Sequence, residues 1–313
     1  MSAPGAPGGG EGLRLSVVVT VVDAGATLRR CLDGLAAQDS PPSMQVIVPF
    51  DESIEEVGRL AAHYPGFAFL GMGRIEVARP IDTPGGQHEL FDRRRSAGLA
   101  AAEGEIVAIL EDRGVPDPDW AERVDRLHAL PHAVIGGAVE CGVDRTLNWA
   151  VYFCDFARYQ LPLDAGPRPY VTDVNISYKR DALEKTRDLW RDRYHETTVN
   201  WAIARDGGTL FLTPELVVRQ HREGLRLGPV LHERLDWGRL FAYTRVRECT
   251  TGRRAMYALL SPVLPVLLFL RHTRMQIQKR ARLGAFVRAA PFVAVLLAAW
   301  SLGELRGYVT GRG

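Results

Sequence analysis

Blocks of apolar residues alternate with amphipathic stretches along the first two thirds of the chain. Residues 15–22 (LSVVVTVV) are almost all apolar and β-branched, which is typical of a strand buried on both faces. Apolar residues at helical spacing follow over 28–35. The pattern then repeats with a strand at 45–48, a helix over 54–63 and a strand at 67–70. This alternation predicts an α/β fold with a mostly parallel sheet and helices on both faces.

A further buried strand is expected at 106–110, and it stops abruptly in three charged residues, Glu111, Asp112 and Arg113. The Gly-Val-Pro sequence at 114–116 is expected to form a turn, because proline cannot continue a central strand. Charged side chains at the end of a buried strand lie at the carboxyl edge of the sheet, where open α/β sheets bind ligands. The plain alternative is that these charges only solvate a loop.

The sequence that follows is expected to add four strands, at 133–140, 170–178, 210–212 and 216–218. An aromatic cluster lies between the first two of them, at Trp149, Tyr152, Phe153, Phe156 and Tyr159. Core packing or a groove wall is the simplest role for this cluster, and stacking on a sugar is the alternative.

The C-terminal part contains two long apolar segments, 255–270 and 283–305, separated by the basic connector 271–282. A spanning helix needs about twenty apolar residues, so the first segment is short and the second is marginal. If both crossed a bilayer, the connector would lie on the far side from the body, against the positive-inside preference. We therefore expect the first segment to lie in the membrane interface and the second to dip in or span once. A buried helical hairpin is the alternative.

Composition and charge support a folded body with a different kind of tail. Of the 313 residues, 46% are hydrophobic and 24% are charged, which suits a globular core. The net charge is only +2, yet from Val217 onward there are seventeen Lys and Arg but five Asp and Glu, which leaves an acidic body. A basic, apolar tail predicts contact with an anionic membrane surface. Nucleic acid is not expected as a partner, because long apolar runs interrupt the basic residues.

Cysteine usage and the N-terminus indicate location and boundaries. Four scattered cysteines without a C-x-x-C pair predict reduced thiols in a cytosolic protein. Residues 1–12 are rich in Gly and Pro, lack a signal-peptide pattern and are expected to form a flexible tail. We expect an α/β domain over 13–230 and a membrane-associated helical region over 231–313, which would hold the protein at the cytoplasmic face of a membrane.

Six segments resemble, in the same order, the motifs of family 2 glycosyltransferases, which have the GT-A fold and use nucleotide-sugar donors. They are LSVVVTVVDAGATLRRCLDGLAAQ, QVIVPFDES, RRRSAGLAAAEGEIVAILEDRGVPDPDW, VNISYKRDAL, HETTVNWAIARDGG and, at the end, WSLGELRGYVTG, which is similar to the ending of membrane-attached members. The resemblance covers nearly the whole chain from Leu13. It implies a GT-A type α/β domain that transfers a sugar, followed by a membrane-associated helical region.

The chain departs from the family at the D-x-D motif, whose two carboxylate positions fall on Glu111 and Arg113. In the family these carboxylates hold a divalent metal, and Mg²⁺ or Mn²⁺ requires oxygen ligands. One interpretation keeps a metal on Glu111 and Asp112, and the presence of two adjacent acids favours it. In the other interpretation Arg113 itself neutralises the donor diphosphate, since a guanidinium pairs well with phosphate oxygens.

The resemblance also implies residues that bind the donor. Asp23 and Asp51 end the first two strands and would line the nucleoside pocket, with Phe50 at the position of one family aspartate. Arg95 and Arg113 would add positive charge beside the diphosphate, and a metal held by Glu111 and Asp112 is the other candidate for that charge.

Three further residues receive roles from the same resemblance. Glu196 falls on the acidic motif that supplies the general base, and His195 beside it could orient the acceptor or act as a second base. Asn175 falls on the acceptor-side motif. Without the resemblance, Glu196 would be read as an acid that complements the helix dipole.

The implied reaction is an inverting single displacement, in which an acceptor hydroxyl attacks the anomeric carbon of a nucleotide-diphosphate sugar. The acceptor would be lipid-linked or a cell-envelope polysaccharide. Two other classes remain open. One is a degenerate, membrane-attached protein that binds nucleotide sugars or serves as a scaffold. The other is a nucleotidyltransferase, which usually carries a Gly-rich phosphate loop, whereas VVDAGATL offers a single glycine.

Overall fold

A computed structural model describes residues 12–246 and 249–311, so the expected flexible tail at 1–12 lies outside it except for its last residue. Within the described residues, one sheet has the order β3-β2-β1-β4-β8-β6-β9-β5, and β7 pairs with β9. The strands are β1 Leu15–Thr20, β2 Met44–Phe50, β3 Ala68–Gly71, β4 Ile106–Glu111, β5 Gly114–Pro116, β6 Val134–Cys141, β7 Gly166–Pro167, β8 Asn175–Lys179 and β9 Leu210–Gln220.

The helices alternate with these strands and then form a layer of their own. They are α1 Gly25–Ala36, α2 Pro84–Ala100, α3 Trp120–His128, α4 Thr146–Phe156, α5 Arg180–Glu184, α6 Arg187–Trp190, α7 Glu196–Arg205, α8 Leu227–Val246, α9 Thr251–Leu260, α10 Leu264–Lys279 and α11 Leu283–Thr310. Three 3₁₀ helices complete the set: η1 Glu52–Ala62, η2 Ala157–Tyr159 and η3 Ser261–Val263.

The expected α/β architecture is confirmed, and the sheet is mixed. Strands β3, β2, β1 and β4 pair in parallel, as the alternation of strands and helices predicts. Strand β8 then runs antiparallel to both β4 and β6. The parallel half brings the carboxyl ends of β1, β2 and β4 to one edge, where the charged residues that follow these strands gather.

Alternating residues of the central strands feed two hydrophobic cores, one on each face of the sheet. Leu15 and Val17 of β1 belong to the core that includes α1, η1 and α3. Val18 belongs to the other core, which includes α4, α7 and α11. Because successive side chains of a strand point to opposite faces, a strand must be apolar throughout to serve two cores. The apolar strand at 15–20 therefore supplies side chains to both cores.

Three details of the second half differ from the sequence prediction. Gly114–Pro116 forms the short edge strand β5 rather than a turn, antiparallel to β9, and a proline is tolerated at such an edge. Residues 170–174 precede the strand instead of starting it, because β8 begins at Asn175. The two strands expected at 210–218 are one continuous β9, in which Pro214 lies between the two stretches that pair with β6.

Most of the aromatic cluster packs in the core, and Tyr152 and Phe156 also line a cavity described below. Trp149, Tyr152, Phe153 and Tyr159 are each at most 7% exposed, and Phe153 packs edge-on against Phe286 of α11 at 5.2 Å between ring centroids. This helix therefore joins the sheet to the C-terminal helices.

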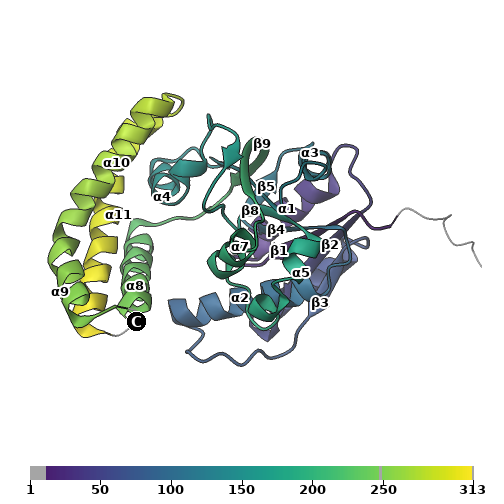
Figure 1. Ribbon diagram of the computed structural model, residues 1–313, viewed down its shortest axis with the longest axis horizontal. Helices are drawn as coiled ribbons and strands as arrows, with labels where there is room; N and C mark the ends of the chain where they lie inside the picture. The colour runs from purple at the N-terminus through teal and green to yellow at the C-terminus, as the bar shows by residue number, and fades with distance from the viewer. Residues whose placement is uncertain (1–11, 247–248, 312–313) are drawn as a thin grey trace, which may run out of the picture.

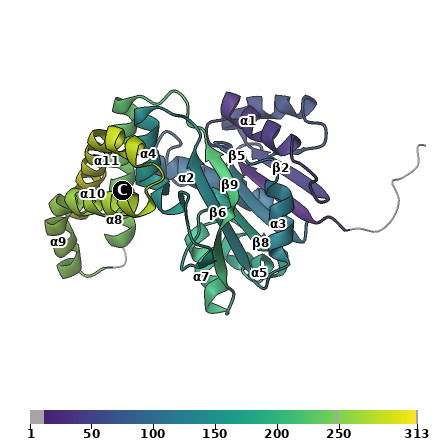
Figure 2. The same cartoon turned by 90° about the horizontal axis from the view of Figure 1, so that it is seen from above.

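The C-terminal helices form a separate layer beside the α/β domain. Figure 1 shows α9, α10 and α11 along one side of the molecule, with α8 and α4 between them and the sheet, and Figure 2 shows the same layer at one end from above. Helices α8 and α11 are in backbone contact. A Cβ on Gly303 would lie 2.0 Å from the carbonyl oxygen of Leu235, and one on Gly238 would lie 2.1 Å from that of Trp300. Glycine at these positions allows the close approach.

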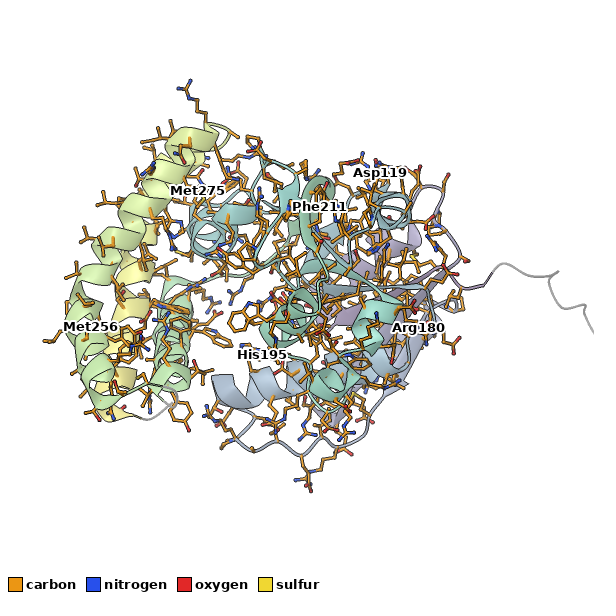
Figure 3. All side chains as sticks on the ribbon, viewed as in Figure 1. Asp119, Arg180, His195, Phe211, Met256 and Met275 are labelled. Atoms are coloured by element: carbon orange, nitrogen blue, oxygen red, sulfur yellow. The ribbon has the colours of Figure 1, made fainter. Side chains whose placement is uncertain are left out.

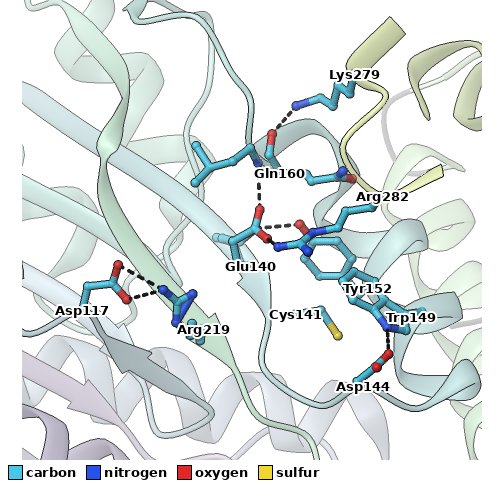
Figure 4. Close-up of polar contacts among 12 residues, drawn as sticks. Asp117, Glu140, Cys141, Asp144, Trp149, Tyr152, Gln160, Arg219, Lys279 and Arg282 are labelled. Carbon is cyan, nitrogen blue, oxygen red and sulfur yellow. Dashed lines mark hydrogen bonds and ion pairs between the residues drawn. The ribbon is translucent and has the colours of Figure 1, made fainter. Parts of the chain in front are cut away.

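The basic connector between α10 and α11 is bound to the α/β domain. Figure 4 shows the contacts. Arg282 pairs with the buried carboxylate of Glu140 at 2.9 Å, and the other oxygen of Glu140 accepts the backbone N–H of Leu161. The Lys279 ammonium donates to the carbonyl oxygens of Gln160 and Pro162, the latter at 2.9 Å. The connector therefore lies against the α/β domain.

The outer face of this layer is apolar. Residues 251–279 and 283–310 form two helical stretches long and apolar enough to cross a membrane by length and composition. Leucine and valine side chains point outward, with Leu259 79% exposed and Val266 59% exposed. Met256 of α9, labelled in Figure 3, is also exposed. An exposed surface of this kind indicates a membrane or protein contact.

Candidate functional site

A cavity of about 310 Å³ lies where the carboxyl end of β4 meets the C-terminal helices. Glu111 and Arg113 line it from the end of β4, and Asp173 lines it from the loop before β8. Trp237 of α8 and Trp300 of α11 form part of the opposite wall. We call it the donor cavity, after the nucleotide-sugar donor that the resemblance of the sequence implies. It combines strand-end charges with aromatic walls, a pattern typical of small-molecule sites.

Arg95 of α2 connects the acidic residues at this point. Its guanidinium lies 3.1 Å from Glu111 and 2.8 Å from Asp173, and its Nε donates to the hydroxyl of Thr20 at 3.1 Å. The Arg95 side chain is buried, with Asp92 3.6 Å away on the same helix. Several acids around one buried arginine fix the position of that positive charge at the end of the strand.

Asp173 and Glu196 form a carboxyl pair behind the cavity wall. The Glu196 carboxyl lies close to the backbone N–H and to the side chain of Asp173. Burial raises the pKa of Glu196 well above its ordinary value, and the charge of Asp173 raises it further. Asp173 lines the cavity. Glu196, the first residue of α7, is not one of the residues that line it.

Glu111 is the second titratable acid at the cavity. Burial and the nearby Asp173 raise its pKa to about 7, although Arg95 opposes the shift. His88 also lines the cavity and packs edge-on against Trp237 at 4.1 Å between ring centroids. Burial and the charge of Arg95 lower the pKa of His88 to about 4, so it is a neutral ring at physiological pH. Titratable groups with shifted pKa values in one cavity are typical of a functional site.

Arg113, which replaces a carboxylate of the D-x-D motif, pairs with Asp23. Its Nε and one terminal nitrogen donate to the two carboxylate oxygens of Asp23 at 2.7 and 2.6 Å, the planar two-bond geometry that arginine favours. Burial alone would raise the pKa of Asp23, but the pairing with Arg113 lowers it below its ordinary value. The ends of β1 and β4 are therefore joined at the cavity.

Asp112 serves the fold rather than the cavity. It is fully buried, and one carboxylate oxygen accepts the backbone N–H groups of Val22, Asp23 and Ala24 at 3.0, 2.9 and 2.7 Å. Burial raises its pKa to about 6. Glu111 and Asp112 therefore do not form the two-carboxylate site expected from the sequence, because adjacent strand residues point to opposite sides.

The donor set at the cavity fits a divalent metal poorly. Glu111 and Asp173 are the carboxylates on its wall nearest Arg95, and both pair with that guanidinium. Within residues 12–246 and 249–311, no group of three or more His, Cys, Asp and Glu side chains is placed to hold a metal ion.

Asp51 lies at a second cavity, of about 710 Å³, at the carboxyl end of β2. Its carboxylate pairs with the buried Arg94 at 2.6 Å and accepts the backbone N–H of Ser53 at 2.8 Å. Burial would raise the pKa of Asp51, but these bonds lower it. Helix α2 links Asp51 to the donor cavity. Arg94 pairs with Asp51, and the next residue, Arg95, pairs with Glu111.

Two further predicted residues, Asn175 and His195, also do not line the donor cavity. Asn175 is buried, and its amide is fully used: its oxygen accepts the indole N–H of Trp120, and its nitrogen donates to the carbonyls of Ala138 and Leu216. It fixes the sheet rather than facing an acceptor. His195, labelled in Figure 3, is exposed, and its Nδ1 lies 3.3 Å from the Thr198 hydroxyl.

Several cavity residues were not foreseen. Asp173 lies in an irregular loop two residues before Asn175, and only its acidic side chain within VTDVN could have drawn attention to it. Trp237 and Trp300 come from helices assigned to the membrane region, so a site role was not considered for them. The two tryptophans reach the cavity only because the C-terminal helices fold against the α/β domain.

A family model described as glycosyl transferase family 2 matches residues 16–187, more than half of the chain. The chain belongs to this family. The glycosyltransferase has no significant match among curated proteins. The matched segment contains Glu111 and Asp173, which line the donor cavity, and Asp51, which lines the second cavity. It also contains Asp23 and Arg95, which pair with Arg113 and Glu111.

Solved structures share its fold. The mannosyltransferase PcManGT from Pyrobaculum calidifontis, in complex with GDP-Man and Mn²⁺, is 17% identical with a TM-score of 0.51. The alignment covers 94% of this chain and 86% of that one. S. aureus TarS 1–349 is 12% identical, with a TM-score of 0.47 and coverage of 91% and 90%. The likeness to PcManGT extends through the C-terminal helices and supports the GT-A assignment.

Proposed function

We propose that the glycosyltransferase moves a sugar, with inversion, from a nucleotide-diphosphate donor to a hydroxyl of a lipid-linked or cell-envelope acceptor. The observation that carries this proposal is the cluster at the carboxyl end of β4, where Arg95 joins Glu111 and Asp173 beside a cavity. PcManGT, which shares the fold, binds GDP-Man. A donor with a diphosphate suits this place because buried guanidinium groups pair well with phosphate oxygens.

We propose that Asp173 accepts the proton of the attacking hydroxyl, with Glu196 as the residue that positions it. An acceptor hydroxyl has a pKa far above neutrality, so a carboxylate must take its proton as the new bond forms. Asp173 lines the cavity, and the Glu196 carboxyl lies beside it. Burial and the charge of Asp173 raise the pKa of Glu196, which favours the protonated form of Glu196.

The departing diphosphate gains negative charge, and Arg95 and Arg113 are the cations beside it in this proposal. Arg113 lines the cavity, and its pairing with Asp23 fixes its direction. A divalent metal such as the Mn²⁺ bound to PcManGT is the alternative source of positive charge. It would have to be held by Glu111 and Asp173, which would first have to leave Arg95.

We also propose that the helical layer rests on the cytoplasmic face of a membrane. The exposed apolar face of α9 and α10 supports it, and so do the basic residues on the same helices, such as Arg253 and Arg274. The connector at 271–282 is bonded to the α/β domain through Lys279 and Arg282. This contact favours helices that lie along the membrane surface over a hairpin that spans it. An acceptor carried by the membrane would then meet the enzyme directly.

The test is a transfer assay on the full chain with a panel of UDP-, GDP- and dTDP-sugars and membrane extracts as acceptor. We expect Asp173→Asn to lower kcat about 100-fold or more, the range typical of losing a general base. Glu196→Gln should lower kcat and shift the acid limb of the pH–rate profile, because Glu196 has a raised pKa and lies beside Asp173. Both variants should keep donor affinity.

The matched control is Glu215→Gln, an acid on β9 that pairs with Arg126 away from the cavity. Chelation by EDTA followed by Mn²⁺ addition belongs to the same assay, and activity that survives EDTA supports the arginine interpretation. Full activity in Asp173→Asn would refute the base assignment. Donor binding without any transfer in the wild type would support the scaffold alternative instead.

A further inference from the structure

A second cavity adjoins the donor cavity inside the helical layer. Its volume is about 450 Å³, and it lies among α4, α8, α10 and α11. Asp155, Arg234 and Trp300 line both cavities, so the two are neighbours separated by single side chains. We call it the lipid-side cavity.

One wall of the lipid-side cavity is apolar. It is lined by Phe241, Leu264, Leu268, Leu296 and Leu297. Leu264 and Leu268 face the cavity from α10, while Leu267 and Leu270 of the same helix are 56% and 58% exposed on its outer face. The apolar wall is thus one helix away from the surface that we place against the membrane.

The remaining wall is rich in positive charge. Arg158, Arg234, Arg245 and Arg271 line it, against two carboxylates, Asp155 and Glu304. Asp155 is taken by Arg234 in a two-bond pair, and Glu304 accepts hydrogen bonds from Trp300 and Tyr308. Among the residues that the structure describes, Arg158 and Arg271 have no carboxylate partner, although they lie close enough for their charges to repel. Both side chains are exposed, and Arg158 also lies over the Tyr170 ring at 4.8 Å. An anion bound beside these two cations would be favoured by both charges.

Buried polar atoms without partners line the same cavity. His272 is 4% exposed, and its Nδ1 has no hydrogen-bond partner among the described residues. Arg234 is 7% exposed, and its Nε is also without a partner in that part of the chain. Buried polar groups are normally satisfied, so unsatisfied ones on a cavity wall point to a ligand that completes them.

We propose that the lipid-side cavity binds the phosphate group of the lipid that accepts the sugar. Arg158 and Arg271 would hold the phosphate oxygens, His272 would complete the polar shell, and the alkyl chain would lie along Leu264 and Leu268. The hydroxyl beyond the phosphate would then reach the donor cavity past Arg234 and Trp300. This assignment rests on the proposed function, and it specifies a phospholipid-type acceptor with a hydroxylated head group.

The proposal is tested by the binding of dodecyl phosphate to the full chain in a neutral detergent, measured by calorimetry. We expect the wild type to bind it and Arg158→Gln with Arg271→Gln to weaken binding at least tenfold, while Arg271→Lys retains it. Leu268→Trp, which fills the apolar wall without changing charge, should also weaken binding. Arg288→Gln is the control, because Arg288 lies on α11, which also lines the cavity, but is not itself a lining residue.

Inorganic phosphate and dodecyl maltoside separate the contributions of charge and chain. Inorganic phosphate that binds as tightly as dodecyl phosphate would overturn the assignment to a lipid. Unchanged affinity in the double variant would overturn the site itself. Nucleotide-sugar binding is measured in the same samples. A wild type that binds dodecyl phosphate but no nucleotide sugar would reject the proposed function and leave this site standing.

Discussion

At the scale of single residues, the sequence indicated which strand ends carry the chemistry but not how their side chains pair. Arg95, Glu111 and Arg113 line or adjoin the donor cavity, because position at the end of a buried strand is readable from hydrophobicity. Asp173 was not foreseen, since its place depends on a loop that no periodic pattern describes. Asp112 could not be separated from Glu111, because its partners are backbone N–H groups 88–90 residues earlier.

Asp92 offers a test of the electrostatics around Arg95. Burial raises its pKa to about 7, so the carboxyl ionises more readily in the unfolded chain than in the folded one. Its charge therefore opposes folding above about pH 7, and this cost fades as the pH falls toward 4. We expect Asp92→Asn to raise Tm by about 2–4 °C at pH 8 and less at pH 5.

Thermal unfolding followed by circular dichroism at several pH values measures this difference. Asp206→Asn, at an exposed position after α7, is the matched control and should leave the pH profile unchanged. A Tm gain for Asp92→Asn that is the same at every pH would contradict the electrostatic explanation.

At the scale of elements, the strand and helix order was predictable because each element carries its own periodicity. The extent of β9 was not, because Pro214 interrupts the pattern while the strand continues past it. The packing of α8 on α11 was also hidden. Glycines in apolar helices do not reveal which helix approaches them. Here a Cβ on Gly303 would meet α8, whereas a Cβ on Gly284 would meet nothing within 4 Å.

This contrast gives a prediction for the helical layer. Gly303→Ala would place a Cβ 2.0 Å from the carbonyl oxygen of Leu235, so α8 and α11 must separate. We expect a loss of about 1–3 kcal/mol in the free energy of unfolding. Gly284→Ala on the same helix should gain about 0.5–1 kcal/mol, because alanine favours the helix and meets no neighbour. Denaturant unfolding in detergent measures both, and equal effects would show that the close packing is unimportant.

At the scale of the whole molecule, the fold family was predictable from ordered motifs, and the two-part charge distribution indicated a surface-bound tail. The docking of the connector onto the α/β domain was not. Charge patterns assign Lys279 and Arg282 to water or to a membrane, whereas Glu140 and Gln160 hold them. Long-range partners of this kind are set by tertiary packing.

Membrane association is tested with vesicles. We expect the full chain to sediment with vesicles that contain anionic lipid, and to be released by high salt in part, because apolar burial and charge both contribute. Leu267→Glu with Leu270→Glu should weaken binding about tenfold or more, since both side chains are over half exposed on α10. Leu130→Glu, at an exposed leucine of the α/β domain, is the control. Retained binding in the double variant would remove α10 from the contact surface.

The anchoring of the connector has one mechanical consequence. With Arg282 bonded to Glu140 and Lys279 bonded to the carbonyl of Pro162, the helical layer is tied to the α/β domain at the connector. If the helical layer lies on the bilayer, these bonds would keep the donor cavity at a fixed height above the lipid. The enzyme would then select acceptors by the length of the spacer between the alkyl chain and the hydroxyl that receives the sugar.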